Sequence, residues 1–235
     1  MLLVLDVGNT NTVLGVYEMG LPAITAKKNA PRLIAHWRVA TIKTHTVDEY
    51  GVLFRNLFAI GKVEAGDVRG IIISSVVPQM DFTLREVCER YFHLKPLFVE
   101  PGIKTGMPVL TDNPVEVGAD RIVNGIAAFE KYGGPCVVVD FGTATNFDIV
   151  SRKGEWIGGV IAPGIGISAQ ALFEHTARLP RVDIRRPAKV IGTNTVASIQ
   201  SGLYFGYLGL VDGILDRLLA DLGPETKVVA TGGLA

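Results

Sequence analysis

Two short polar turns hold most of the residues in this sequence that could do chemistry on a phosphate group. The first turn, GNTN at 8–11, follows an apolar run at 2–5 and Asp6. Its small residues let backbone N–H groups approach an anion closely, and an adjacent aspartate can hold a metal–phosphate complex. An ordinary β-hairpin with an acid near its turn has the same pattern, so this stretch alone leaves both interpretations open.

A second stretch nearly repeats the first. The segment VVDFGTATNFDIV at 138–150 matches VLDVGNTNTVLGV at 4–16 in strand, acid, glycine, hydroxyl-bearing turn and return strand, with Asp140 in the place of Asp6. A purely structural duplication, in which the acids only cap turns, would also give a repeat. Because both turns keep the acid and the hydroxyl groups, we favour two related domains whose turns grip the phosphates and metal of one nucleotide across a cleft.

The composition excludes several classes of protein. Lys plus Arg and Asp plus Glu both number 23, so the formal net charge is zero and nothing predicts a nucleic-acid partner. The N-terminus has no basic region and its apolar run stops at Asp6, so we expect no signal peptide, and no apolar run is long enough to span a membrane. Cys88 and Cys136 lie far apart without ligand-spaced partners, so we expect buried, reduced thiols in a cytoplasmic protein.

The order of the predicted elements is typical of an α/β protein. After the first hairpin we expect, in chain order, a strand at 36–39, a helix at 46–60, a strand at 70–77, a helix at 80–91, a strand at 96–99, a helix at 117–132, the second hairpin at 136–150, a strand at 154–161, a helix from about residue 168, an exposed basic loop at 176–187, a helix at 195–222 and a strand at 227–233. Prolines and glycines crowd 100–114, so we expect an N-terminal domain at 1–114 and a C-terminal domain at 115–235.

Duplicated mixed sheets flanked by helices, with a nucleotide cleft between them, resemble the actin-like (ribonuclease H-like) fold of the actin-like ATPase and sugar-kinase superfamily. A fold of this kind should continue with another helix after the last strand, so we expect the C-terminal helix to be missing.

The long helix predicted at 195–222 carries Gly202, Gly206 and Gly209, which lower helix stability. We therefore expect another backbone to pack closely there, at a subunit interface or at an interdomain contact.

The sequence resembles the type III pantothenate kinase family over essentially its whole length. The motifs that carry this resemblance occur in the family's order: DVGNTNTVLGVY, EVGADRIVN, VVDFGTATNFD, GGVIAPG, LPRV, IGTNTVASIQSG and ATGGLA. The resemblance implies that the γ-phosphoryl group of ATP is transferred to the 4′-hydroxyl of pantothenate, which gives 4′-phosphopantothenate in the first step of coenzyme A biosynthesis. It also implies Mg²⁺, a monovalent cation (K⁺ or NH₄⁺), and a homodimer with active sites near the dimer interface.

The same resemblance assigns roles to single residues. Asp120 is the expected catalytic base, because a carboxylate can accept the proton of a primary alcohol as the P–O bond forms; the alternative is a helix N-terminal acid favoured by the dipole. Asp6 should orient Mg–ATP and Asp140 should bind the monovalent cation. Thr195 should contact the substrate, or else be a plain helix N-cap. The remaining expected contacts are Val7, Gly8, Asn9, Thr10, Asn11, Thr12, Val13 and Thr143 to ATP, Gly118, Ala119 and Arg121 to pantothenate, and Gly232 and Gly233 near the adenosine.

Two features depart from the family's pattern. Many members carry a tyrosine shortly before the NP that precedes GADR, whereas this sequence has Thr111, which cannot supply the same aromatic wall to the substrate pocket. The loop at 21–33 is also longer than usual.

Two other functions are alternatives to pantothenate kinase activity. Another actin-fold phosphotransferase, such as a sugar or acetate kinase or a polyphosphate phosphatase, would lack the GADR and GTNTV pair at these positions. A nucleotide-binding regulator without kinase activity is disfavoured because Asp6, Asp120 and Asp140 are all intact.

Overall fold

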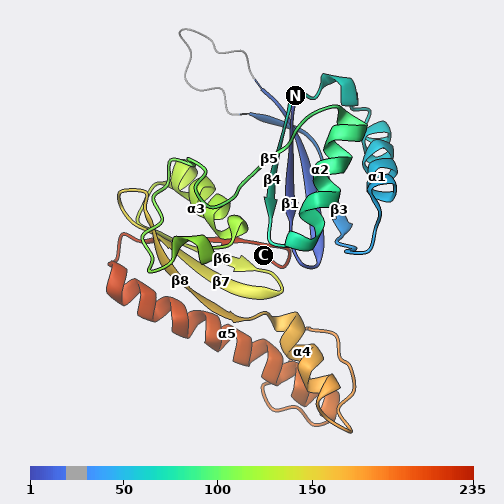
Figure 1. The fold of residues 1–235 in the computed structure, drawn as a ribbon. Helices are drawn as coiled ribbons and strands as arrows, with labels where there is room; N and C mark the ends of the chain where they lie inside the picture. The colour runs from blue at the N-terminus through green and yellow to red at the C-terminus, as the bar shows by residue number, and fades with distance from the viewer. Residues whose placement is uncertain (20–30) are drawn as a thin grey trace. The chain divides into compact units, whose positions relative to one another are not determined.

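The computed structural model describes residues 1–19 and 31–235 (Figure 1). Most of the long loop noted at 21–33 lies outside the described residues. The chain forms two compact units, each built on its own mixed sheet. Unit 1 comprises residues 1–104 and 115–123, and unit 2 comprises residues 105–114 and 124–235. The simpler domain boundary expected near residue 114 stays a prediction.

The sheet of unit 1 begins with the predicted hairpin. Its strands are β1 (Leu2–Val7), β2 (Asn11–Glu18), β3 (Arg32–Ala40), β4 (Gly70–Ser75) and β5 (Leu97–Phe98), in the order β3-β2-β1-β4-β5. β1, β2 and β3 form an antiparallel meander, while β4 pairs parallel to β1, as the uniformly apolar sequence of β4 predicts. β1 is longer than predicted, so Asp6 lies within the strand, opposite Val13, rather than after its end.

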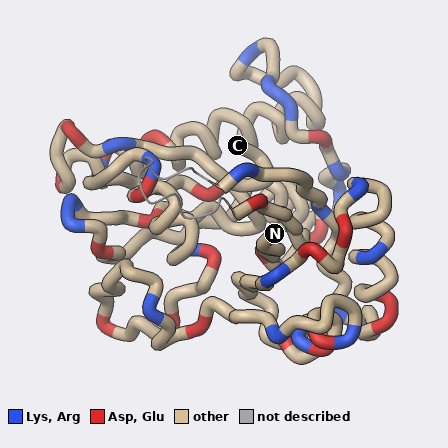
Figure 2. Tube along the Cα trace, turned by 90° about the horizontal axis from the view of Figure 1, so that it is seen from above, with Lys and Arg blue, Asp and Glu red and all other residues tan. Residues whose placement is uncertain are grey.

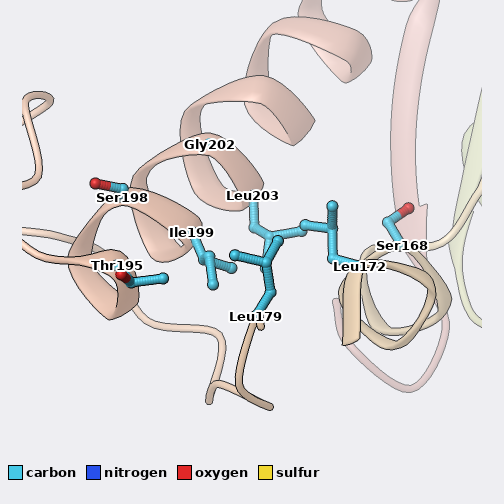
Figure 3. A pocket seen from close by; sticks show the side chains of 8 residues that line it. All are labelled: Ser168, Leu172, Leu179, Thr195, Ser198, Ile199, Gly202 and Leu203. Carbon is cyan, nitrogen blue, oxygen red and sulfur yellow. The ribbon is translucent and has the colours of Figure 1, made fainter. Parts of the chain in front are cut away.

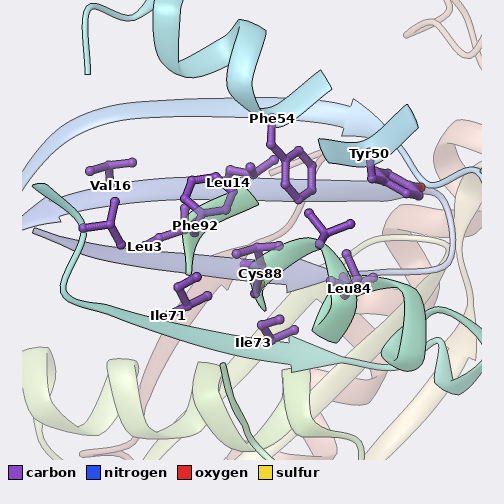
Figure 4. Packing of buried hydrophobic residues seen from close by; sticks show 14 of the residues in the cluster. Leu3, Leu14, Val16, Tyr50, Phe54, Ile71, Ile73, Leu84, Cys88 and Phe92 are labelled. Atoms are coloured by element: carbon purple, nitrogen blue, oxygen red, sulfur yellow. The ribbon is translucent and has the colours of Figure 1, made fainter. Parts of the chain in front are cut away.

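Two helices cover the apolar face of this sheet. They are α1 (Val47–Ile60) and α2 (Pro78–Phe92), which the helical spacing of apolar residues predicts. Thr46 and Glu49 form a capping box at the start of α1, and a proline occupies the first position of α2. Figure 4 shows the resulting core, in which the following side chains meet: Tyr50 and Phe54 of α1, Leu84, Cys88 and Phe92 of α2, and Leu3, Leu14, Val16, Ile71 and Ile73 of the strands.

The sheet of unit 2 follows the same plan. Its strands are β6 (Cys136–Phe141), β7 (Ala144–Val150), β8 (Trp156–Pro163) and β9 (Lys227–Thr231), in the order β8-β7-β6-β9. β6, β7 and β8 form an antiparallel meander and β9 pairs parallel to β6, as β4 does with β1. The repeat seen in the sequence is therefore a repeat of strand topology.

Three helices accompany this second sheet. They are α3 (Ala119–Tyr132), α4 (Ile165–Glu174) and α5 (Thr195–Leu222), and the chain passes from unit 1 to unit 2 within α3. α4 begins earlier than predicted, directly after Gly164. Side chains from the second half of α5 pack on a small core made by β6 and β7: Val211, Ile214, Leu215, Leu218 and Leu222 against Val137, Val139, Phe147 and Ile149.

The three glycines of α5 lie on a side of the helix that the described chain leaves open. A Cβ atom built at Gly202, Gly206 or Gly209 would have no neighbouring atom of the described residues within 4 Å. Within unit 2, no described residue packs against these glycines, and the expected subunit or interdomain contact stays a prediction.

The charged residues and the cysteines behave as the composition predicts. Figure 2 shows Lys and Arg interspersed with Asp and Glu along the chain. In the described part of the chain, no helix has the length and apolar content needed to cross a membrane. Cys88 and Cys136 are both buried and not disulfide-bonded, and burial raises the pKa of the Cys88 thiol to about 12.

Phe54→Ala tests the core of unit 1. Phe54 has no exposed surface, so the truncation should lower the free energy of unfolding of this unit by about 3–5 kcal/mol. Val52→Ala, on the same helix but 52% exposed, is the matched control and should change it by less than about 0.5 kcal/mol. Urea unfolding followed by circular dichroism measures both, and equal midpoints for the two variants would contradict the assignment of this core.

Candidate functional site

The first turn is closed by its own backbone and held by a distant threonine. The Gly8 N–H donates to the Asn11 carbonyl at 3.0 Å, which leaves Asn9 and Thr10 exposed at the tip. Thr41, just after β3, donates its hydroxyl to the Gly8 carbonyl at 2.7 Å and its backbone N–H to the Thr10 carbonyl at 2.9 Å. Asp6 is exposed on the neighbouring strand. Sequence reasoning did not select Thr41, because no local pattern links it to the turn.

The second turn is shorter, and the start of α4 holds it. The Gly142 N–H donates to the Ala144 carbonyl at 3.0 Å, and Thr143 is exposed at the tip. The Gly164 N–H, at the start of α4, donates to the Thr143 carbonyl at 3.0 Å. A Cβ at Gly164 would lie 2.4 Å from that carbonyl oxygen, so only glycine fits there.

The carboxylate of Asp140 is fixed in orientation within unit 2. The Asn124 side-chain amide on α3 donates to Asp140 Oδ2 at 2.9 Å. On the other side, a Cβ at Gly232 would lie 2.5 Å from Asp140 Oδ1, and Gly232 has a φ of +103°, so this position requires glycine for both space and conformation. Asn124 was not singled out from the sequence, although it follows Asp120 by one helical turn.

Asp120 lies half-buried in the first turn of α3. Its Oδ1 accepts the backbone N–H of Arg121 at 2.8 Å. Burial raises the pKa of Asp120 above its ordinary value, against the opposing effect of the Arg121 N–H and charge. The direction of the shift follows from the burial of the carboxylate, and the role of Asp120 as the catalytic base stays a prediction.

Gly118 gives the Asp120 carboxylate its space. A Cβ at Gly118 would lie 2.6 Å from Asp120 Oδ1 and 3.4 Å from a methyl group of Val76. A glycine two residues before Asp120 therefore leaves room for the Asp120 carboxylate within unit 1.

Thr195 is the first residue of α5, and it is exposed. The N-cap is Asn194, whose Oδ1 accepts the backbone N–H of Ala197 at 2.8 Å, so the alternative that Thr195 is a plain N-cap is wrong. Thr195 instead lines a pocket of about 570 Å³ between α4, α5 and the segment that contains Leu179 (Figure 3). The walls of this pocket are mainly apolar, and Thr195, Ser168 and Ser198 are the lining residues that carry hydroxyl groups.

Thr111, the departure noted in the sequence, has a hydroxyl that is enclosed by the protein. Its Oγ1 is buried and makes no hydrogen bond to any described residue. A buried hydroxyl without a partner costs free energy, which is typical of positions where a ligand can supply the missing partner.

The predicted residues thus fall into four local groups. These are the first turn with Asp6, the segment 118–121, the hairpin that carries Asp140 and Thr143, and the start of α5. The model of the family "Type III pantothenate kinase" matches residues 2–217. The chain belongs to this family. The family predicted from the motifs is therefore confirmed.

Similar proteins support this membership over the full chain. Type III pantothenate kinase of Koribacter versatilis is 74% identical over 235 residues, which is 100% of this chain and 85% of the relative. The proteins of the same name from Acidobacterium capsulatum and Myxococcus xanthus are 58% and 54% identical, and this chain again aligns in full, with 85% and 88% of them.

Solved structures support the fold. A Ppx/GppA phosphatase of Aquifex aeolicus has a TM-score of 0.52 at 13% identity, with 99% of this chain and 67% of that chain covered. Ethanolamine utilization protein EutJ of Carboxydothermus hydrogenoformans has a TM-score of 0.50 at 15% identity, with 98% and 75% covered. The predicted actin-like α/β fold is confirmed, and identities this low carry nothing about activity.

Gly118→Ala tests whether the space beside Asp120 matters. The added methyl group must displace the Asp120 carboxylate, so kcat for ATP-dependent turnover should fall by roughly 10- to 100-fold. Gly66→Ala is the control, because a Cβ at Gly66 meets nothing within 4 Å. Steady-state kinetics measure kcat, and the melting temperature shows whether a loss of kcat comes from a displaced carboxylate or from a misfolded protein. A Gly118→Ala enzyme with normal kcat would show that the carboxylate needs no such space.

Proposed function

We propose that this chain uses ATP to phosphorylate pantothenate at its 4′-hydroxyl, the first step of coenzyme A biosynthesis. The observation that carries the proposal is the half-buried Asp120, with its raised pKa, in the GADR segment of a chain that matches the pantothenate kinase family over residues 2–217. The intact acids at positions 6, 120 and 140 support a working phosphotransferase rather than a nucleotide-binding regulator.

Asp120 is the general base in this proposal. A primary alcohol is a poor nucleophile, and a carboxylate within hydrogen-bond reach can accept its proton as the new P–O bond forms. Burial raises the pKa of Asp120 toward the operating pH, which makes it a better proton acceptor than a fully solvated aspartate. Gly118, Ala119 and Arg121, which flank it, hold the pantothenate.

The first turn and Thr143 hold the nucleotide. Backbone and side-chain groups of residues 8–11 and 13 contact the phosphates, and Thr143 makes a further contact from the second turn. Val7 and Thr12 were also expected as ATP contacts, but they have no exposed surface, so they support the turn from below instead. Mg²⁺ binds ATP enzymes through one or two carboxylates together with the phosphates and retained waters. The single exposed carboxylate of Asp6 beside the turn suits that role, and the ion would neutralise charge on the transferred group.

Asp140 binds the monovalent cation, K⁺ or NH₄⁺. The Asn124 amide occupies one carboxylate oxygen and fixes its plane, so the group is held ready for a cation. An ionised carboxylate is an acceptor-only oxygen donor, which suits a hard cation.

The protein acts as a homodimer, in which Thr195 contacts the substrate near the subunit interface. Large apolar side chains are exposed on α4, on the segment before α5 and on the first half of α5; Ile191 is 82% exposed and Val190 is 65% exposed. Exposed apolar surface of this kind typically marks an interface. The open side of α5 at its three glycines would also admit a partner's backbone closely.

Cytoplasmic location is part of the same proposal. It rests on the metabolic role and on the two buried free cysteines, which suit a reducing compartment.

Asp120→Asn tests the base and the activity together. The variant keeps the shape of the side chain and an oxygen for the Arg121 N–H, so ATP binding should persist while pantothenate-dependent ADP release falls at least about 100-fold. The exposed Asp112→Asn is the control. A coupled ADP assay with and without pantothenate measures the effect. Wild-type enzyme without pantothenate-dependent turnover would overturn the proposed function, whereas a near-normal rate in Asp120→Asn would overturn only the base.

The same variant should be more stable than the wild type at neutral pH. Because the pKa of Asp120 is raised in the fold, this group stabilises the folded state below its ordinary pKa and loses that contribution as the pH rises through the raised value. The stability gain of Asp120→Asn should therefore shrink as the pH falls from neutral through that window. Melting temperatures across the pH range test this, and a gain that grows in acid would contradict the direction of the shift.

Asp140→Asn should abolish the response to potassium. Replacing the carboxylate removes the charge that attracts the cation, so added KCl should no longer raise the melting temperature or the rate. Choline chloride at equal ionic strength is the reference salt, and Asp212→Asn, exposed on α5, is the matched variant. A full potassium response in Asp140→Asn would assign the cation to other residues.

A further inference from the structure

We propose that Thr41 and Tyr207 are positioning residues for the nucleotide turns, each acting through a buried threonine hydroxyl. The inference rests on the proposed function, because it takes the two turns as the phosphate-binding elements. Neither side chain belongs to a motif that the sequence analysis selected. Both come from elements distant in sequence from the turn that they hold.

In unit 1 the buried hydroxyl belongs to Thr12. This residue has no exposed surface and pairs with Val7 directly below the first turn. Its Oγ1 lies 2.9 Å from the hydroxyl of Thr41. Thr41 therefore makes three hydrogen bonds to the hairpin, to Thr12, to the Gly8 carbonyl and to the Thr10 carbonyl.

In unit 2 the buried hydroxyl belongs to Thr145. It also has no exposed surface, and it pairs with Phe141 directly below the second turn. Its hydroxyl is hydrogen-bonded to the hydroxyl of Tyr207, in the middle of α5. The Tyr207 ring also packs against Phe141, with ring centroids 6.4 Å apart, so it contacts both strands of the hairpin.

The two arrangements occupy the same place in the repeated fold. Thr12 is opposite the residue that follows Asp6, and Thr145 is opposite the residue that follows Asp140. A buried hydroxyl needs a partner, and in each unit another hydroxyl supplies it. One partner comes from the end of a strand and the other from a helix, so the repeated property is the hydroxyl pair and not the element that provides it.

This placement gives each pair a defined effect on the turn above it. In the first turn, Thr41 fixes two carbonyl groups, and these fix the direction in which the neighbouring N–H groups point. In the second turn, Tyr207 ties the turn to α5, the helix that begins at Thr195. Loss of either partner should loosen the phosphate donors without removing any group that touches the substrate.

Paired variants test the inference by nucleotide affinity. Thr41→Val and Tyr207→Phe remove one hydroxyl each with little change of shape, and each should raise both the KM for ATP and the Kd for a non-hydrolysable ATP analogue by roughly 5- to 30-fold. The KM for pantothenate should stay within about twofold for Thr41→Val. Thr41→Ser, which keeps the hydroxyl, should restore near-normal values.

Matched controls remove threonine or tyrosine hydroxyls at unrelated positions. Thr44→Val, at an exposed residue near Thr41, and Tyr204→Phe, one turn before Tyr207 on α5, should leave the ATP analogue affinity unchanged. If Thr41→Val folds poorly, the double variant Thr12→Val with Thr41→Val removes both hydroxyls and leaves no unpaired one. It should fold and still bind the analogue weakly, because the Gly8 carbonyl has lost its donor.

The outcomes distinguish the positioning role of Thr41 and Tyr207 from the proposed kinase activity. If Thr41→Val and Tyr207→Phe melt at lower temperature but bind the analogue normally, the pairs are merely structural and the inference is overturned. Absence of pantothenate-dependent turnover in the wild type would overturn the proposed function alone, because the analogue Kd still reports on the turns. Isothermal titration calorimetry without pantothenate gives that Kd directly.

Discussion

The two-residue period of a β-strand is the constraint on which the rest of this molecule depends. In β1, Leu3, Leu5 and Val7 have no exposed surface, so Asp6 must face the other way, where it is exposed. In β6, Val137 and Val139 join the core on one face, while Asp140 lies on the other face together with Val138, which is also buried. Because side chains alternate between the two faces of a strand, each hairpin places one carboxylate next to its glycine turn, on the face opposite to the core.

Glycine and hydroxyl groups then shape what surrounds these acids. Gly164 against the second turn and Gly232 beside Asp140 have no room for a side chain, because backbone atoms lie against them, whereas a side chain at Gly118 would have to displace the Asp120 carboxylate. Polar groups are fixed by donors that arrive from elsewhere, as when the Asn124 amide orients Asp140. The orientation of the Asp140 carboxylate thus depends on Asn124, which contacts no substrate in the proposed mechanism.

The sequence predicts much of this fold because the helices and strands obey local rules. α1 could be placed from the helical spacing of its apolar residues and the acids near its start, and α5 from a continuous helical stretch that begins after Asn194. The end of β1 was missed because an acid after an apolar run looks like the start of a turn, whereas pairing with β2 extends the strand beyond it. Thr41, Asn124 and Tyr207 could not be found this way, since their importance lies in tertiary hydrogen bonds to residues far away in the chain. Sequence motifs therefore identify the residues proposed to act on the substrates more readily than the residues that position them.

The two turns differ in length, and this breaks the symmetry of the duplication. Gly8, Asn9 and Thr10 link β1 to β2, whereas only Gly142 and Thr143 link β6 to β7. One turn therefore offers an extra peptide group to whatever lies against it. The two halves of the duplication therefore present different numbers of backbone donors, and neither turn is equivalent to the other.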